Sequence, residues 1–171
     1  MREGFLDFYR RWRDKAELVV DALNSLKGVP EVPDTGSLRH DLCALADSIA
    51  GTEGKFSAQM TIGLVNAVAH DAALRRVFQE RFLAPRMAGF RKVFEQAVAR
   101  GEMPGGHDLD LLARLFPALA LQHLVTSGEL PGTQLACQIM DEVVYPLATA
   151  PAARTSPAPH ATAEGKPHGY P

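Results

Sequence analysis

Apolar residues recur at intervals of three and four along most of this chain, and this spacing restricts its possible folds more than any other feature. Leu38, Leu42 and Leu45 fall on one side of a helix, because such intervals match a helical turn of 3.6 residues. Residues 71–100 and 108–127 repeat the pattern over greater lengths. No stretch alternates apolar and polar residues strongly enough to indicate a half-buried strand. The sequence therefore predicts an all-α fold.

Capping residues set the boundaries of the predicted helices. Ser37, Asp71 and Asp108 are expected to begin helices, because their short polar side chains accept hydrogen bonds from the free N–H groups of a first turn. Gly101 and Gly128 are expected to end them, because glycine adopts the left-handed conformation that follows many helices. The predicted helices cover residues 14–27, 37–50, 55–69, 71–100, 108–127 and 133–145.

Three of these helices carry further expectations. Pro85 predicts a kink in the longest helix, because proline removes a backbone hydrogen bond and clashes with the preceding turn. Thr133 is expected to cap the last helix, with Pro146 directly behind its end. Ile62 and Val65 widen the apolar stripe of the third helix, so we expect that helix to be buried on more than one side.

Composition indicates a water-soluble body with a basic tip. The chain has 171 residues, 46% of them hydrophobic, which is enough for one globular core. Its net charge is −2, yet residues 1–15 hold five cations and three carboxylates. Such a division is typical of a small DNA-binding head on a ligand-binding body.

Other sequence features favour a cytoplasmic location. Cys43 and Cys137 match no metal or redox spacing and are interpreted as small core residues in a reducing compartment. No N-terminal signal peptide is visible, and the longest apolar run, residues 115–125, is too short to span a membrane. We find no catalytic constellation, phosphate loop or metal-spaced set, so no enzyme, cofactor or metal is expected.

Residues 9–18, Tyr-Arg-Arg-Trp-Arg-Asp-Lys-Ala-Glu-Leu, gather aromatic and basic side chains around the start of the first predicted helix. Asp14 is the expected N-cap, so Lys15 lies in the first turn, where a cation is unfavourable against the helix dipole. A lysine is more easily explained there if it faces an anion outside the protein. The candidates for contacts with DNA phosphates are Tyr9, Arg10, Arg11 and Lys15. In the alternative interpretation, the aromatic residues form the apolar side of a short helix and the arginines are solvated.

The order Tyr-x-x-Trp-x-x-Lys-x-x-Leu in this stretch resembles the end of the DNA-binding domain of TetR-family transcriptional regulators. Residues 33–39, Pro-Asp-Thr-Gly-Ser-Leu-Arg, resemble the linker and first helix of a regulatory domain found in one subgroup of that family. Residues 71–102, ending Ala-Val-Ala-Arg-Gly-Glu, are similar to its long central helix. The resemblance runs from about Tyr9 to Leu147.

The resemblance implies a TetR-like helical bundle with an incomplete N-terminal DNA-binding head. Residues 1–28 would be the remnant of a helix-turn-helix domain with its connecting helix, and residues 34–147 a ligand-binding and dimerisation domain. Residues 148–171 are rich in Ala, Pro, Thr and His and are expected to form a disordered tail.

The implied function is that of a ligand-responsive transcriptional regulator of the repressor type. Residues 1–8 depart from the family's recognition helix, because Asp7 stands where threonine is usual and Gly4 near the usual serine. The family's first two helices have no counterpart before them, so we expect impaired operator binding by the chain as given. The alternative is an all-α dimer that binds a ligand, or forms mixed dimers, without DNA-binding activity.

A small hydrophobic effector is the expected ligand, because the resemblance places a cavity among the helices of the body. His123, near the end of an otherwise apolar helix, is a candidate polar anchor in such a cavity. In the alternative interpretation it is a satisfied core or interface histidine, and the aromatic residues are core. The predicted pocket residues are Met60, Leu64, Phe82, Phe90, Phe116 and His123.

A second copy of the chain is the expected protein partner. The last two predicted helices carry more apolar surface than one neighbouring face can cover, and the resemblance implies a four-helix interface between identical patches. The predicted interface residues are Leu119, Leu121, Ile139 and Val143. The other expected partner is DNA, if the head is completed; no membrane partner is expected.

Overall fold

The computed structural model describes residues 15–50 and 57–152, and every regular element within these ranges is a helix. The predicted all-α fold is therefore confirmed. The α-helices are α2 (Lys15–Lys27), α3 (Leu38–Ala50), α4 (Ala58–His70), α5 (Ala72–Phe78), α6 (Ala84–Arg100), α7 (Leu109–Ser127), α8 (Thr133–Ile139) and α9 (Tyr145–Thr149). Two π-helical segments, η1 (Gln79–Leu83) and η2 (Met140–Val144), join α5 to α6 and α8 to α9.

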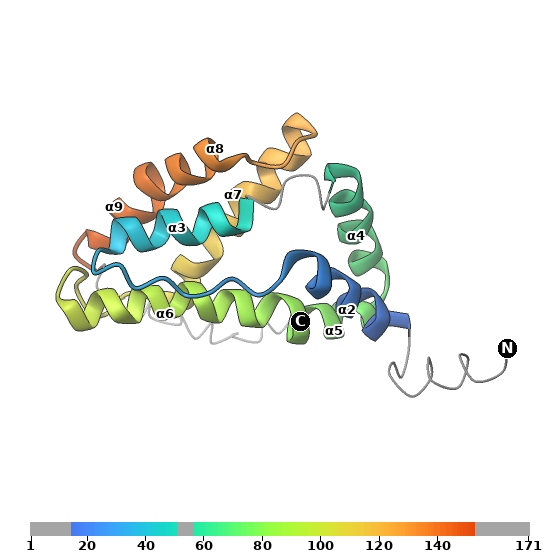
Figure 1. Ribbon diagram of the computed structural model, residues 1–171, viewed down its shortest axis with the longest axis horizontal. Coiled ribbons are helices and arrows are strands. Elements are labelled where there is room, and N and C mark those ends of the chain that lie inside the picture. The colour runs from blue at the N-terminus through green and yellow to red at the C-terminus, as the bar shows by residue number, and fades with distance from the viewer. Residues whose placement is uncertain (1–14, 51–56, 153–171) are drawn as a thin grey trace, which may run out of the picture.

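The elements form a helical bundle built on one long rod, α5–η1–α6 (Figure 1). Helix α3 packs on α6 and on the second rod, α8–η2–α9, while α7 packs against both rods. Helix α2 packs on α5, and the segment after it runs in extended form along α6 to reach the start of α3 (Figure 1). The bundle therefore has a body around α3 and α7 and an extension formed by α2, α4 and α5.

The main core lies where α3, α6, α7 and the second rod meet. Phe90 and Phe94 of α6 are almost fully buried against Leu42 of α3 and Met140 of η2. A smaller cluster lies between α2 and α5 and consists of Ala16, Val20, Leu74 and Val77. Because this second cluster is small, α2 depends on additional polar contacts to hold its position on the body.

Two of the predicted N-caps, Asp71 and Asp108, hold the starts of their helices. The Asp71 carboxylate accepts hydrogen bonds from the N–H groups of Ala73 and Leu74 at 2.9 and 3.0 Å. The Asp108 carboxylate accepts from the N–H of Leu111 at 2.9 Å. Gly101 ends α6 with a φ of 76°, in the left-handed region that glycine tolerates.

Both rods widen into a π-helical turn two residues before a proline. In the first rod, η1 ends at Leu83 and Pro85 follows; in the second, η2 ends at Val144 and Pro146 follows. A proline has no N–H for the ladder of i to i−4 bonds, and a π turn shifts that ladder by one residue at this point. A kink was expected at Pro85, and the structure has a π turn that ends two residues before it. The last helix continues through Pro146 to Thr149, beyond its predicted end near residue 145.

The predicted cap of the last helix was wrong. Gly132 is the capping residue, and Thr133 is the first residue of α8. The Thr133 hydroxyl instead donates to Asp47 Oδ1 of α3 at 2.7 Å. Local capping preferences predict that the Thr133 side chain caps its own helix, but it bonds instead to a residue that is distant in the sequence.

The expected burial of the third predicted helix was also wrong. No residue of α4 is buried, and Met60, Ile62 and Val65 expose 49%, 48% and 42% of their surface. In this chain α4 packs chiefly on α5. The width of an apolar stripe shows how much apolar surface a helix carries. It does not show whether another helix packs on that surface.

Candidate ligand-binding cavity

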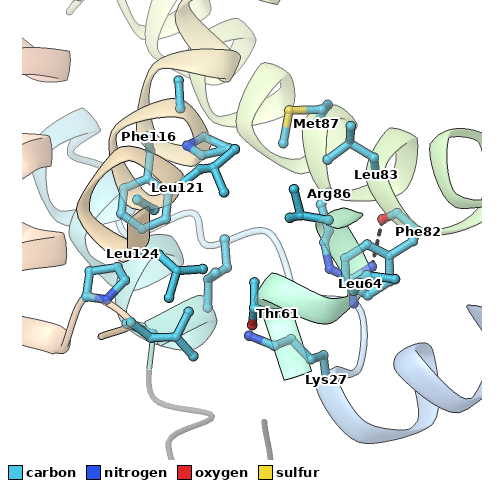
Figure 2. Close-up of a pocket in the computed structure, with 18 of the residues that line it drawn as sticks. Lys27, Thr61, Leu64, Phe82, Leu83, Arg86, Met87, Phe116, Leu121 and Leu124 are labelled. Atoms are coloured by element: carbon cyan, nitrogen blue, oxygen red, sulfur yellow. Dashed lines mark hydrogen bonds between the residues drawn. The ribbon is translucent and has the colours of Figure 1, made fainter. Parts of the chain in front are cut away.

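A cavity of about 430 Å³ opens between α4, α6 and α7, with the end of α2 and the α7–α8 loop at its edge (Figure 2). Its size is within the range of small-molecule sites in proteins. The lining residues are Lys27, Ile49, Ala50, Thr61, Leu64, Val65, Phe78, Phe82, Leu83, Arg86, Met87, Phe90, Phe116, Pro117, Ala118, Ala120, Leu121, Leu124, Leu130 and Pro131. Most of these side chains are apolar.

Aromatic rings form two parts of the wall. The rings of Phe78 and Phe82 are stacked, with centroids 5.0 Å apart, and the Arg86 guanidinium lies 3.6 Å from the Phe82 centroid. The rings of Phe90 and Phe116 are tilted, with centroids 5.9 Å apart. These contacts fix flat apolar surfaces on the long rod α5–η1–α6 and on α7.

Arg86 is the polar centre of this wall and exposes only 8% of its surface. Its Nη1 donates to Oδ1 of Asn24 at 3.2 Å and to the carbonyl oxygen of Phe82 at 2.7 Å, as Figure 2 shows for Phe82. Its Nη2 donates to the carbonyl oxygen of Gly28, at the end of α2. These acceptors are neutral, and burial lowers the pKa of the Arg86 guanidinium. The hydrogen bonds from Arg86 to Asn24 and Gly28 thus join the cavity wall to α2.

Lys27 supplies a second cation to the cavity. Burial, and then repulsion by Arg86, lower the pKa of its ammonium group. None of the described residues that line the cavity is acidic. The cavity thus combines an apolar interior with a positively charged edge.

Four of the six predicted pocket residues line this one cavity, namely Leu64, Phe82, Phe90 and Phe116. Met60 and His123 do not line it. Met60 is half exposed on α4, and His123 is partly buried on α7. The prediction missed Lys27 and Arg86. The one available signal for Arg86 was its position within the row of phenylalanines on the long helix.

The predicted interface residues occupy different environments. Ile139 is buried in the core, and Leu119 packs against that core. Leu121 lines the cavity, and Val143 is partly buried. Leu111 and Val125 of α7 are far more exposed, at 60% and 72%. Their spacing, with exposed Ala118 midway, places them on one helix face.

The predicted phosphate contacts are only partly visible. Lys15 is exposed at the first position of α2, whereas Tyr9, Arg10 and Arg11 lie outside the described residues, as do Asp14 and residues 153–171.

Among the described helices, α7 is by length and composition apolar enough to cross a membrane, a property shared by core helices of water-soluble proteins. Within the same ranges, no group of three metal-ligating side chains comes together.

Comparison with known proteins gives a consistent family match. A family model described as "Tetracyclin repressor-like, C-terminal domain" matches residues 32–143. An uncharacterised HTH-type transcriptional regulator of Mycobacterium tuberculosis is 32% identical over 142 residues, which are 82% of this chain and 70% of that protein. The DNA-binding transcriptional repressor TetR of Mycobacteroides abscessus is 30% identical over 141 residues, 81% of this chain and 74% of that protein.

Proposed function

Because this chain belongs to the TetR family of transcriptional regulators, we propose that it is a repressor whose DNA binding responds to a small apolar molecule. The observation that carries this proposal is the cavity between α4, α6 and α7. A cavity with an apolar lining and a few directional polar groups is the usual form of a small-molecule site.

The contacts of Arg86 provide a route from the cavity to α2. Its guanidinium lines the cavity and also holds Asn24 and the Gly28 carbonyl at the end of α2. A ligand that contacts Arg86 would change the energy of these hydrogen bonds and so bias the position of α2. A ligand shifts such an equilibrium only through this kind of differential contact.

We also propose that the protein acts as a homodimer through α7 and the second rod. The support is the exposure of Leu111 and Val125 on one face of α7, with Leu147 of α9 exposed at 48%. A partner copy would cover apolar surface that water otherwise contacts. In this proposal the apolar character of α7 serves an interface rather than a membrane, and the regulator works in the cytoplasm beside its DNA.

A mobility-shift experiment tests the main proposal. The protein is titrated onto its own promoter region and onto a scrambled fragment of equal length, at low and moderate salt. Weak binding that still prefers the promoter fragment is the expected result, because residues 1–8 depart from the family's recognition helix. A thermal-shift screen identifies ligands, since a ligand that binds the native state raises its melting temperature, and such a compound should release the protein from the promoter fragment. Selective binding that no stabilising compound alters would contradict ligand control.

A second candidate function is a ligand-binding or mixed-dimer regulator without operator binding of its own. Asp7 and Gly4, in place of the usual threonine and serine, favour this alternative, because base readout depends on a recognition helix seated in the groove. Both residues lie outside the described ranges. In the same mobility-shift experiment, this candidate shows only salt-sensitive binding that does not distinguish the two fragments.

A further inference from the structure

We propose that the ligand of the cavity is an amphipathic anion, an unbranched carboxylic acid whose chain fills the apolar interior and whose carboxylate meets Lys27 and Arg86. This inference rests on the proposed function, because it names the class of molecule that the same cavity takes. It follows from the charge, the apolar lining and the size of the cavity.

The charge of the lining is one-sided. Lys27 and Arg86 are the cationic side chains of the lining, and no acidic side chain is found among the lining residues described. Arg86 is nearly buried and donates to neutral oxygens of Asn24, Phe82 and Gly28, so its positive charge is solvated but not neutralised. A buried charge is costly without a counter-charge. A carboxylate at this edge would supply one.

The two cations act on the same region. Repulsion by Arg86 is one of the causes of the lowered pKa of Lys27, which places the two groups within electrostatic reach of each other. Two neighbouring cations attract a single anion more strongly than either does alone, and the effect is larger where water is excluded. Arginine also offers paired donors that match the geometry of a carboxylate.

The rest of the cavity suits a hydrocarbon chain. Leu64, Val65, Leu83, Met87 and Leu124 contribute aliphatic surface, and Thr61 is the neutral polar side chain of the lining. At about 30 Å³ per atom, the share of one water molecule in the liquid, 430 Å³ holds roughly 14 non-hydrogen atoms. Dodecanoate has this number of atoms and is therefore the probe of choice.

The experiment compares three probes with one chain length and different heads. Dodecanoate, dodecan-1-ol and dodecyltrimethylammonium are titrated into the full chain at pH 7 by calorimetry, each below its micelle concentration. We expect dodecanoate to bind at least about tenfold tighter than the alcohol, because hydrogen bonds to charged groups are worth that much. The ammonium compound should bind most weakly.

Two variants locate the effect. Lys27→Met removes the charge but keeps an unbranched apolar side chain, so it should lower dodecanoate affinity about tenfold while leaving dodecan-1-ol affinity unchanged. Lys92→Met is the matched control, because Lys92 is exposed on α6 and does not line the cavity. It should change neither affinity. Melting curves of both variants show that each is folded before it is titrated.

The outcomes separate the two proposals. Equal affinity for acid and alcohol, or loss of acid binding in both lysine variants, would overturn the anionic ligand and leave the apolar cavity in place. Failure of all three probes, together with no stabilising compound in the wider thermal-shift screen, would overturn the ligand-binding function itself. Tight binding of the ammonium compound alone would assign the opposite charge to the ligand.

Discussion

The side-chain amide of Asn24 donates from Nδ2 to the carbonyl oxygen of Arg81 at 3.1 Å. Pro85 lies four residues after Arg81 and has no N–H, so this oxygen lacks its usual helical donor. The same asparagine accepts through Oδ1 from Arg86. One residue of α2 therefore supplies the donor missing at the proline and also holds the arginine of the cavity wall.

Asn24→Ala should destabilise the protein by about 1–3 kcal/mol, because it removes two hydrogen bonds, one of them to a charged group. Urea unfolding measures the change. Ser25→Ala is the neighbouring control, since the Ser25 hydroxyl donates only to the Asp21 carbonyl of its own helix in the contacts seen here. Equal effects of the two substitutions would show that Asn24 does not join α2 to the long rod.

The Arg100–Asp41 pair joins the end of α6 to α3. Arg100 Nη2 donates to Asp41 Oδ2 at 2.9 Å, and Thr35 donates through its N–H and hydroxyl to Oδ1 at 2.6 and 2.7 Å. Asp41 is fully buried. Asp41→Ala should therefore cost about 2–4 kcal/mol of stability, because it leaves buried donors without their acceptor.

Asp34→Ala is the control for that prediction. Asp34 pairs with the same Arg100, at 2.8 Å, but its side chain is 61% exposed. Exposed ion pairs contribute little, so a much smaller loss of stability is expected. A loss as large as that of Asp41→Ala, in the same thermal or urea melts, would contradict the role given to burial.

Acid should weaken the contact between Glu102 and α3. The N–H of Leu38 donates to Glu102 Oε2 at 2.7 Å, and this bond, with the bond from Arg100, holds the pKa of Glu102 below its ordinary value. A lowered folded-state pKa gives stability that is present above the unfolded pKa of about 4.3 and is lost as pH falls through the folded value. Wild type should therefore exceed Glu102→Gln in stability at pH 7, and the difference should shrink toward pH 3. A difference that stays constant with pH would contradict this linkage.

The proposed dimer face predicts the effect of a charge on α7. Val125→Glu should give a monomer by light scattering, because it would bury an unpaired carboxylate at the interface. Gln122→Glu is a control on the same helix, at an exposed polar position. Leu119→Glu is a poor test, since Leu119 packs against the core and its change would disturb folding. A wild-type monomer would end the proposal.

Cys43 should react slowly with thiol reagents. Burial, and then contact with Cys137, raise the pKa of its thiol to about 12, so almost no thiolate is present at pH 8. Alkylation by iodoacetamide, followed by peptide mapping, should label Cys43 only after unfolding. Rapid labelling of Cys43 in the native protein would contradict the packing of its thiol, on α3, against Cys137 of α8.

Local chemistry was enough to predict the class of fold and most helix ends. Asp71 and Asp108 cap their helices through bonds that span two or three residues, and Gly101 and Gly128 end theirs through their own backbone conformation. Such interactions depend on neighbours in the sequence, and a sequence displays them directly. Leu64, Phe82, Phe90 and Phe116 stood out in the sequence only as members of apolar stripes, and the expectation of a cavity among them came from the family resemblance.

Contacts between distant segments were decided only by the tertiary structure. The Thr133 hydroxyl donates to Asp47 of α3 and does not cap its own helix. Helix α4 is less covered by its neighbours than its apolar stripe indicates. The positive edge of the cavity combines Lys27, at the end of α2, with Arg86, which follows the proline of the long rod. Each residue alone reads as an ordinary solvated cation. Their shared cavity arises from packing between helices some 60 positions apart, which periodicity and capping do not encode.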